Sequence, residues 1–140
     1  GVAYGGSLFV AVGGWDGTVF TSPDGVRWTR RASGTYVILN AVTYANGLFV
    51  AVGEDGAILT SLDGVAWLPC ALWRALRLNA VTYGNGLFVA VGSGGTILTS
   101  PDGLTWTARD SGTDAWLRGV TYGGNRFVVV GDRGTILTSP

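Results

Sequence analysis

The side chains in this sequence that could carry out chemistry are nine acidic and nine basic residues, and the sequence has no histidine and one cysteine. A Ser-His-Asp or Cys-His catalytic site is therefore excluded, because both need a histidine base. A zinc site is disfavoured, because zinc is usually held by cysteine and histidine. Two carboxylates about 5 to 9.5 Å apart can hydrolyse a glycosidic bond. Asp16, Asp55, Asp114 and Asp132 could supply such a pair, but no spacing singles one out.

Hydrolysis of a sialoside would need an arginine cluster for the substrate carboxylate, an acidic proton donor and a tyrosine activated by a carboxylate. Arginines are available, but Glu54 is the one glutamate in the sequence. Three tyrosines, Tyr44, Tyr83 and Tyr122, fall at one repeated position, which indicates packing. We therefore expect no enzymatic activity. A fragment of a sialidase-like glycoside hydrolase stays as an alternative.

The elements that must position these side chains are revealed by an internal repeat of 39 residues. A repeat of this length is typical of a unit that cannot bury its own apolar face and therefore stacks on copies of itself. The residues that recur every 39 positions are the tryptophans Trp28, Trp67 and Trp106, the aspartates Asp24, Asp63 and Asp102, and the glycines Gly25, Gly64 and Gly103.

Each unit predicts four short antiparallel strands, which in the third copy cover residues 78–83, 87–91, 96–100 and 104–107. The first two strands are joined by Asn85-Gly86, a strong signal for a type I′ hairpin because both central residues need a positive φ. Four strands in about 40 residues are typical of a propeller blade. We therefore predict one all-β segment, residues 1–140, with four-stranded antiparallel blades at about 1–38, 39–77, 78–116 and 117–140, the last without its outer strand.

Residues 68–78 depart from this pattern, because their sequence LPCALWRALRL is rich in Ala, Leu and Arg. This composition predicts a helical turn or two after Pro69. Cys70, which stands among apolar neighbours, is predicted to be a small packing residue. As the single cysteine, it cannot form a disulfide within the chain.

The recurring turn reads SPDGVRW, SLDGVAW and SPDGLTW at residues 22–28, 61–67 and 100–106. An aspartate in such a turn can accept hydrogen bonds from the backbone N–H groups ahead of it, and the tryptophan can cover the hairpin. We therefore interpret the recurring Asp, Gly and Trp residues as structural turn residues.

This motif resembles the Asp-box, or BNR, repeat S-x-D-x-G-x-x-W, with one residue between Asp and Gly missing. The wider pattern FVAVG…GTILTSPDG..WT is similar to bacterial Asp-box propellers that include photosystem II assembly-factor-like proteins, and to repeats of cell-surface and phage-tail proteins. The resemblance covers the whole chain and implies a propeller. It implies no single function, because such blades occur in sialidases, glycosidases, lectins, receptors and assembly factors. It favours an extracellular or cell-surface location.

Variation between the units is concentrated in the turns between the second and third strands and in the connections from one unit to the next. In an up-and-down blade these two kinds of loop lie at the same end. Exposed aromatic side chains beside charged groups on a rigid scaffold are typical of a binding surface. The predicted ligand-binding residues are Trp15, Asp16, Trp73, Arg74, Trp116, Arg118, Asp132 and Arg133.

The formal net charge is zero, so no net field draws the chain to nucleic acid or a bilayer. No apolar run reaches the roughly 18 residues of a membrane helix. We expect neither of these partners, no cofactor and no metal. The Gly-rich turns lie between strands without a following helix, so they are not phosphate loops.

The unfinished last blade would leave apolar surface and a sheet edge open to water. We favour closure by a head-to-tail homodimer with eight blades; a four-bladed monomer and continuation into further blades are the alternatives. The predicted function is a non-catalytic binding or scaffold module for a protein partner. A glycan-binding lectin, or an engineered or excised fragment without a ligand, are further alternatives.

Overall fold

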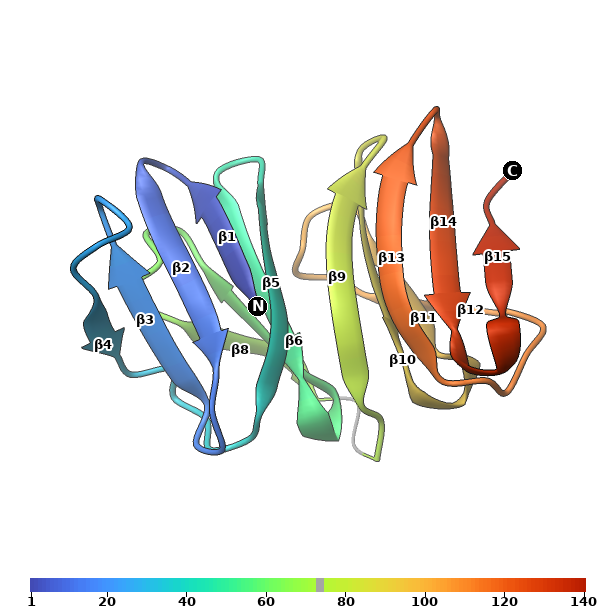
Figure 1. Ribbon diagram of the computed structural model, residues 1–140, viewed down its shortest axis with the longest axis horizontal. Coiled ribbons are helices and arrows are strands. Elements are labelled where there is room, and N and C mark those ends of the chain that lie inside the picture. The colour runs from blue at the N-terminus through green and yellow to red at the C-terminus, as the bar shows by residue number, and fades with distance from the viewer. Residues whose placement is uncertain (73–74) are drawn as a thin grey trace.

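The computed structural model describes residues 1–72 and 75–140, which form four antiparallel sheets in chain order (Figure 1). Sheet A contains β1 (Val2–Gly5), β2 (Leu8–Gly13), β3 (Thr18–Ser22) and β4 (Thr29–Arg31). Sheet B contains β5 (Leu39–Ala45), β6 (Leu48–Gly53), β7 (Ala57–Ser61) and β8 (Leu68–Leu72). Sheet C contains β9 (Leu78–Gly84), β10 (Leu87–Gly92), β11 (Ile97–Ser100) and β12 (Thr107–Arg109). Sheet D contains β13 (Leu117–Gly123), β14 (Arg126–Gly131) and β15 (Ile136–Thr138).

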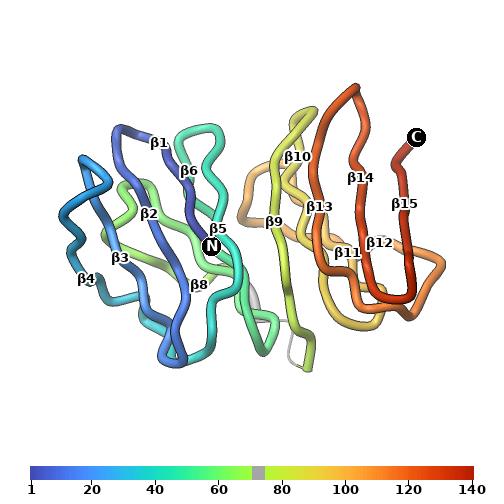
Figure 2. The backbone as a smooth tube through the Cα atoms, viewed as in Figure 1, coloured from blue at the N-terminus to red at the C-terminus, as the bar shows by residue number. Residues whose placement is uncertain are grey.

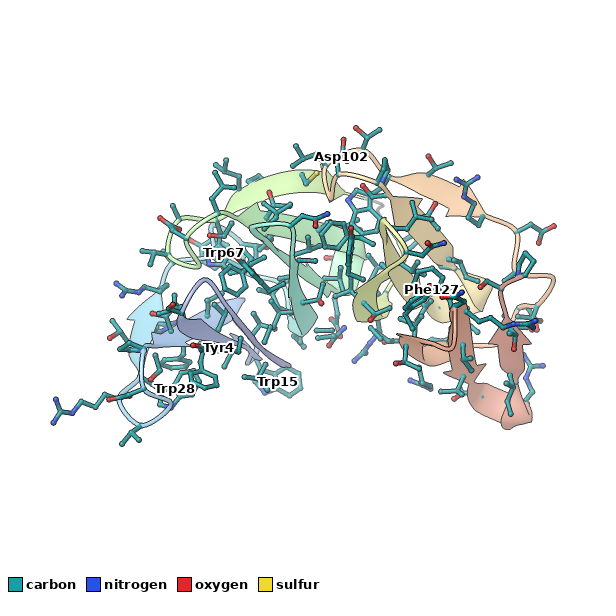
Figure 3. The ribbon with its side chains drawn as sticks, turned by 90° about the horizontal axis from the view of Figure 1, so that it is seen from above. Tyr4, Trp15, Trp28, Trp67, Asp102 and Phe127 are labelled. Atoms are coloured by element: carbon teal, nitrogen blue, oxygen red, sulfur yellow. The ribbon has the colours of Figure 1, made fainter. Side chains whose placement is uncertain are left out.

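Within each sheet the strands follow one another in order, and the first strand of each sheet packs beside the first strand of the next. The chain trace moves from one sheet to the next without crossing back (Figure 2). Seen from above, the sheets stand face to face along an open arc, with sheets A and D at its two ends (Figure 3). The all-β fold with propeller-type blades is therefore confirmed.

The core consists of three separate apolar layers, one between each pair of neighbouring sheets. We call the side of a sheet toward the preceding sheet its rear face and the other side its front face. In β6, Phe49 and Ala51 lie on the rear face against sheet A, whereas Val50 and Val52 lie on the front face against sheet C. Because successive side chains of a strand point to opposite sides, a strand covered on both sides is apolar throughout. This explains the run LFVAVG.

The hairpins between the first two strands of sheets B and C have the predicted turn conformation. Asn46 and Gly47 have φ values of 52° and 76°, and Asn85 and Gly86 have 46° and 77°. Both central residues are thus left-handed, as a type I′ turn requires. The turns between the second and third strands of sheets B, C and D are single 3-10 turns, namely η1 (Glu54–Gly56), η2 (Ser93–Gly95) and η3 (Asp132–Gly134).

The prediction of a helical turn directly after Pro69 was wrong, because residues Leu68–Leu72 form β8. This strand pairs with β7, with a register shift between Ile58 and Leu59. The β7 backbone needs a hydrogen-bonding partner, and an outer strand tolerates the proline. Tertiary pairing therefore overrides the local helical propensity. The Cys70 thiol packs against the core between sheets B and C and donates a hydrogen bond to the Leu104 carbonyl oxygen at 2.7 Å.

The packing of a connection on the sheet that follows it can be tested at a repeated glycine. A Cβ at Gly92 would overlap the backbone oxygen of Arg77, which accepts a hydrogen bond from the Ser93 N–H at 2.8 Å. Gly13 holds the same position in sheet A, where a Cβ would meet nothing within 4 Å. We expect Gly92→Ala to lower the free energy of unfolding by about 1–3 kcal/mol, and Gly13→Ala to change it by less than about 0.5 kcal/mol. Urea unfolding measures both, and equal losses would contradict this packing.

Candidate functional site

The three Asp-Gly turns, at residues 22–28, 61–67 and 100–106, share one hydrogen-bond pattern. In the third turn Asp102 Oδ1 accepts from the N–H groups of Leu104 and Thr105 at 2.8 and 2.7 Å and from the Ser100 hydroxyl at 2.9 Å. The Gly103 N–H donates to Ser100 Oγ at 2.8 Å. The same bonds recur in the other two turns within about 0.2 Å. Each carboxylate is thus held as an acceptor for its own turn.

These hydrogen bonds stabilise the ionised carboxylates. The Thr105 and Leu104 N–H groups lower the pKa of Asp102 to about 2. The pKa values of Asp24 and Asp63 are lowered for the same reason, first by the N–H groups of Arg27 and Ala66. A general acid needs a pKa close to the working pH. The turns therefore suit a structural role better than proton transfer.

The tryptophan of each turn lies on the rear face of its own sheet. Trp67 and Trp106 are 7% and 8% exposed, and their indole N–H groups donate to Gly64 O and Gly103 O at 3.0 Å. Trp28 belongs to sheet A, which has no sheet behind it, and it is 41% exposed. Figure 3 shows Tyr4, Trp15 and Trp28 along the side of sheet A that faces away from sheet B.

The structure places the loops of the predicted binding surface at one end of the sheets, as expected from the strand order (Figure 1). In sheet A, Trp15 is 89% exposed and the neighbouring Asp16 pairs with Arg30. Asp16 also accepts a hydrogen bond from the Thr18 hydroxyl, which together with Arg30 lowers its pKa. A cavity of about 450 Å³ opens beside this group, lined in part by Arg30 and the exposed Tyr36.

A second group of predicted residues comes together around sheet D. Arg118 forms two hydrogen bonds with Asp132, from Nε to Oδ1 at 2.7 Å and from Nη2 to Oδ2 at 2.8 Å. Its guanidinium carbon lies 5.0 Å from the centroid of the Trp116 ring. Arg133 pairs with Asp114 at 2.8 Å. We call these five residues the sheet D cluster.

The charged groups of the sheet D cluster are held in fixed pairs. The Arg118 hydrogen bonds lower the pKa of Asp132, so this carboxylate is ionised. The bidentate geometry fixes the guanidinium plane beside an indole that is 40% exposed. One aromatic ring and paired charges are thus held in fixed positions at one end of sheet D.

The predicted residues thus fall into separate groups. Trp15 and Asp16 lie in sheet A, whereas Trp116, Arg118, Asp132 and Arg133 lie around sheet D at the other end of the arc. Trp73 and Arg74 lie outside the described residues. The ion pair of Glu54 in η1 with Arg77, directly before β9, was not predicted; its N–O distance is 2.9 Å.

Within residues 1–72 and 75–140, no three His, Cys, Asp or Glu side chains gather closely enough to hold a metal ion. The helical segments of the described chain are too short and too polar for any of them to cross a bilayer.

No protein-family model matches the sequence, and comparison with curated proteins gave no match. The structure is similar to that of the computationally designed Ika4 protein, with a TM-score of 0.75 and 16% identity over 99% of this chain and 88% of that chain. It is also similar to YCF48 bound to D1 peptide, with a TM-score of 0.76 and 20% identity over 99% of this chain and 48% of that one. YCF48 from Cyanidioschyzon merolae gives a TM-score of 0.66 and 16% identity over 99% and 50%. The chain spans about half the length of the YCF48 chains, and at these identities the likeness shows the fold.

The depressed aspartate pKa values predict the sign of the pH dependence of stability. A carboxyl whose pKa is lower in the folded state adds stability above its ordinary pKa, and this stability is lost as the pH falls through the folded-state value. For Asp102 that window runs from 3.8 down to about 2. We expect Asp102→Asn, which keeps an acceptor oxygen but cannot ionise, to flatten the fall in stability across this window. Urea unfolding at several pH values tests this, and an unchanged slope would contradict it.

Proposed function

We propose that this chain is a non-catalytic binding module on a propeller scaffold, and that two chains join head to tail. The front face of sheet D in one chain would pack on the rear face of sheet A in the other. With four sheets in each chain, 2 × 4 gives a ring of eight. One observation carries this proposal. The two end faces of the arc bear the same kinds of residue as the two sides of each interface between sheets inside the chain.

The rear face of sheet A carries the same kinds of side chain that sheet B buries against sheet A. In sheet B these residues are Val42, Tyr44, Phe49, Ala51, Leu59 and Trp67. Their counterparts in sheet A are Val2, Tyr4, Phe9, Ala11, Phe20 and Trp28. Val2 is 64% exposed and Tyr4 59%, so this face retains apolar surface that a neighbouring sheet would cover.

The front face of sheet D carries the residues that form the other side of such an interface. Val10, Val12 and Val19 of sheet A are buried against sheet B, and their counterparts in sheet D are Val128, Val130 and Ile136. Val130 is 46% exposed and Ile136 69%. Burial of such side chains stabilises by about 25 cal/mol per Å² of apolar surface. Association of the two end faces would therefore be driven by the hydrophobic effect that joins the internal sheets.

A repeated contact between a tyrosine and a glycine gives the two end faces a matching shape. The ring of Tyr44 lies where a Cβ of Gly5 would project, and Tyr122 lies in the same way on Gly84. Gly123 holds this position in sheet D, where a Cβ would meet nothing within 4 Å. Tyr4 of a second chain would have its ring accepted at that open position.

Charge also favours this pairing. Leu8 and Leu48 each contact the glycine of the next sheet's Asp-Gly turn, Gly64 and Gly103. Arg126 holds the corresponding position in sheet D. In a head-to-tail pair it would face the Asp-Gly turn of sheet A in the second chain, where Asp24 is exposed and ionised. An arginine opposite this carboxylate would help to fix the relative orientation of the two chains.

A binding role is supported over a catalytic one by the pKa values of the aspartates. Each aspartate with a shifted pKa has it lowered by its hydrogen bonds, whereas a glycosidase proton donor needs it raised. One structural neighbour, YCF48, is described as bound to a D1 peptide. This favours a peptide or protein as the partner class, docked on the loop end that carries the sheet D cluster.

The head-to-tail pairing predicts a mass of two chains, 2 × 14.5 = 29 kDa, in solution. Val130→Asp should shift the mass toward one chain, because it places a charge in the contact while its side chain is solvent-exposed in the single chain. Tyr36→Asp, on an exposed loop residue, is the control and should keep the dimer. Light scattering coupled to size exclusion measures all three. A wild-type mass of one chain at micromolar concentration would overturn the dimer.

The partner class can be tested with Trp116→Ala, because an exposed indole beside a guanidinium can also stack on a sugar ring. Under the proposed protein partnership, a glycan array gives no specific signal with the wild-type chain. Specific glycan binding that is lost by at least about tenfold in Trp116→Ala would favour a lectin instead. Unchanged circular dichroism confirms that the variant is folded.

A further inference from the structure

One loop conformation occurs twice in the chain with different side chains. Residues 30–36 lead from sheet A to sheet B and read RRASGTY, whereas residues 108–114 lead from sheet C to sheet D and read ARDSGTD. Each loop connects two sheets of the chain, so the two can be compared position by position.

The same hydrogen bonds fix the backbone of both loops. The Ser33 hydroxyl donates to Thr35 O and accepts from the Thr35 N–H, both at 3.3 Å, and Arg31 Nε donates to Thr21 Oγ1 at 3.0 Å. The loop packs on the preceding turn, where a Cβ at Gly17 would overlap Thr35 O. The same contacts recur in the loop of sheet C, between Ser111 and Thr113, Arg109 and Thr99, and Gly95 and Thr113.

A carboxylate belongs to the loop of sheet C and is replaced by a methyl group in the loop of sheet A. Asp110 Oδ1 accepts a hydrogen bond from the Gly112 N–H at 2.9 Å. Ala32 holds the position of Asp110, and Gly34 that of Gly112. Both glycines are exposed and left-handed, with φ values of 76° and 69°. The loop of sheet A therefore presents a backbone donor at the place where the loop of sheet C binds its own carboxylate.

The two loops also differ in charge. The cavity of about 450 Å³ beside β4, which we call the sheet A groove, is lined by residues 16–18 and 30–36. It contains Arg30 and Arg31, and Arg30 pairs with Asp16, so its net charge is 2 − 1 = +1. The loop of sheet C has one arginine and two aspartates, 1 − 2 = −1, namely Arg109, Asp110 and Asp114. The sheet A groove therefore attracts an anion, whereas the other loop already contains one.

An aromatic side chain adds an apolar contact to the sheet A groove. Tyr36 lines the cavity and is 90% exposed, whereas its counterpart Asp114 pairs with Arg133. Tyrosine and arginine are enriched where proteins contact other proteins. A small inorganic anion would use the charge alone, whereas a peptide can also pack on this ring.

We propose that the sheet A groove binds the side-chain carboxylate of an aspartate or glutamate in a partner peptide. This carboxylate takes the place that Asp110 has in its own loop. It accepts a hydrogen bond from the Gly34 N–H, the guanidinium groups of Arg30 and Arg31 balance its charge, and Tyr36 packs on the peptide. The inference rests on the proposed peptide or protein partnership and adds a contact at the same loop end, separate from the sheet D cluster.

Two blocked peptides test this site by NMR. The peptide acetyl-Ser-Ala-Asp-Ala-Ser-amide has one carboxylate and no charged terminus, and the matched peptide has Asn in place of Asp. In the isotope-labelled 140-residue chain, the Asp peptide should shift the Gly34 amide resonance saturably, whereas the Gly112 amide, already bonded to Asp110, should stay unchanged. The Asn peptide should bind at least about tenfold more weakly, because an ionised acceptor forms the stronger hydrogen bonds. An unmoved Gly34 resonance, or equal shifts with both peptides, would overturn the proposal.

Chain variants locate the binding. Ala32→Asp gives the groove the carboxylate that sheet C already has, so the added Asp peptide should no longer shift the Gly34 resonance. Replacing both Arg30 and Arg31 by Gln should weaken binding about fivefold, whereas Arg27→Gln, on an exposed arginine outside the cavity lining, should retain it. Circular dichroism confirms that each variant is folded. Unchanged binding by Ala32→Asp or by the double variant would show that the peptide binds elsewhere and would overturn the site.

Two further outcomes separate this site from its alternatives. Gly34 shifts of equal size with inorganic phosphate and with the Asp peptide, at equal concentrations, would identify a general anion site and overturn the peptide assignment. Shifts confined to Trp116 and Arg118 would overturn the sheet A groove and leave the proposed peptide partnership in place. Failure of that partnership is measured separately, by the glycan array.

Discussion

The structure depends on burial of each sheet between two neighbours. A single blade of this chain has apolar side chains on both of its faces, as Phe49 and Val50 show in β6. Neither face can be shielded within the blade, so stability comes from the stacking of copies. Sheets B and C meet this requirement within the chain, whereas sheets A and D each meet it on one face. The exposed Tyr4 and Ile136 are the visible consequence.

The turns make this stacking specific. An aspartate that holds its own loop through backbone N–H groups sets a tryptophan over the rear face of its sheet and a glycine against the sheet before it. The charged side chains that vary between units are displaced to the other end, where they pair as Arg118 with Asp132 or Glu54 with Arg77. The scaffold therefore separates an end whose turns repeat from unit to unit from an end whose loops differ between units.

The period of 39 residues and the Asn-Gly hairpins were sufficient to predict the fold, because they report local conformation and repeated burial. The strand at Leu68–Leu72 could not be predicted, since its composition favours a helix and only pairing with β7 reverses this. The candidate site could be predicted in part, because the strand order shows which loops lie at the same end of the sheets. Trp116, Arg118 and Asp132 come together, whereas Trp15 lies apart from them on sheet A. This arrangement depends on the curvature of the arc and on loop conformations, which the repeat pattern does not predict.

Each sheet is stabilised by its neighbours, and we propose that the two end faces pair with those of a second chain. Hydrogen exchange measured as a function of protein concentration tests this pairing. We expect amide protection in β2 and β14, at the two ends of the arc, to rise with protein concentration. Protection in β6 and β10, already covered on both faces, should stay constant. Protection in β2 and β14 that is independent of concentration and equal to that in β6 and β10 would contradict it.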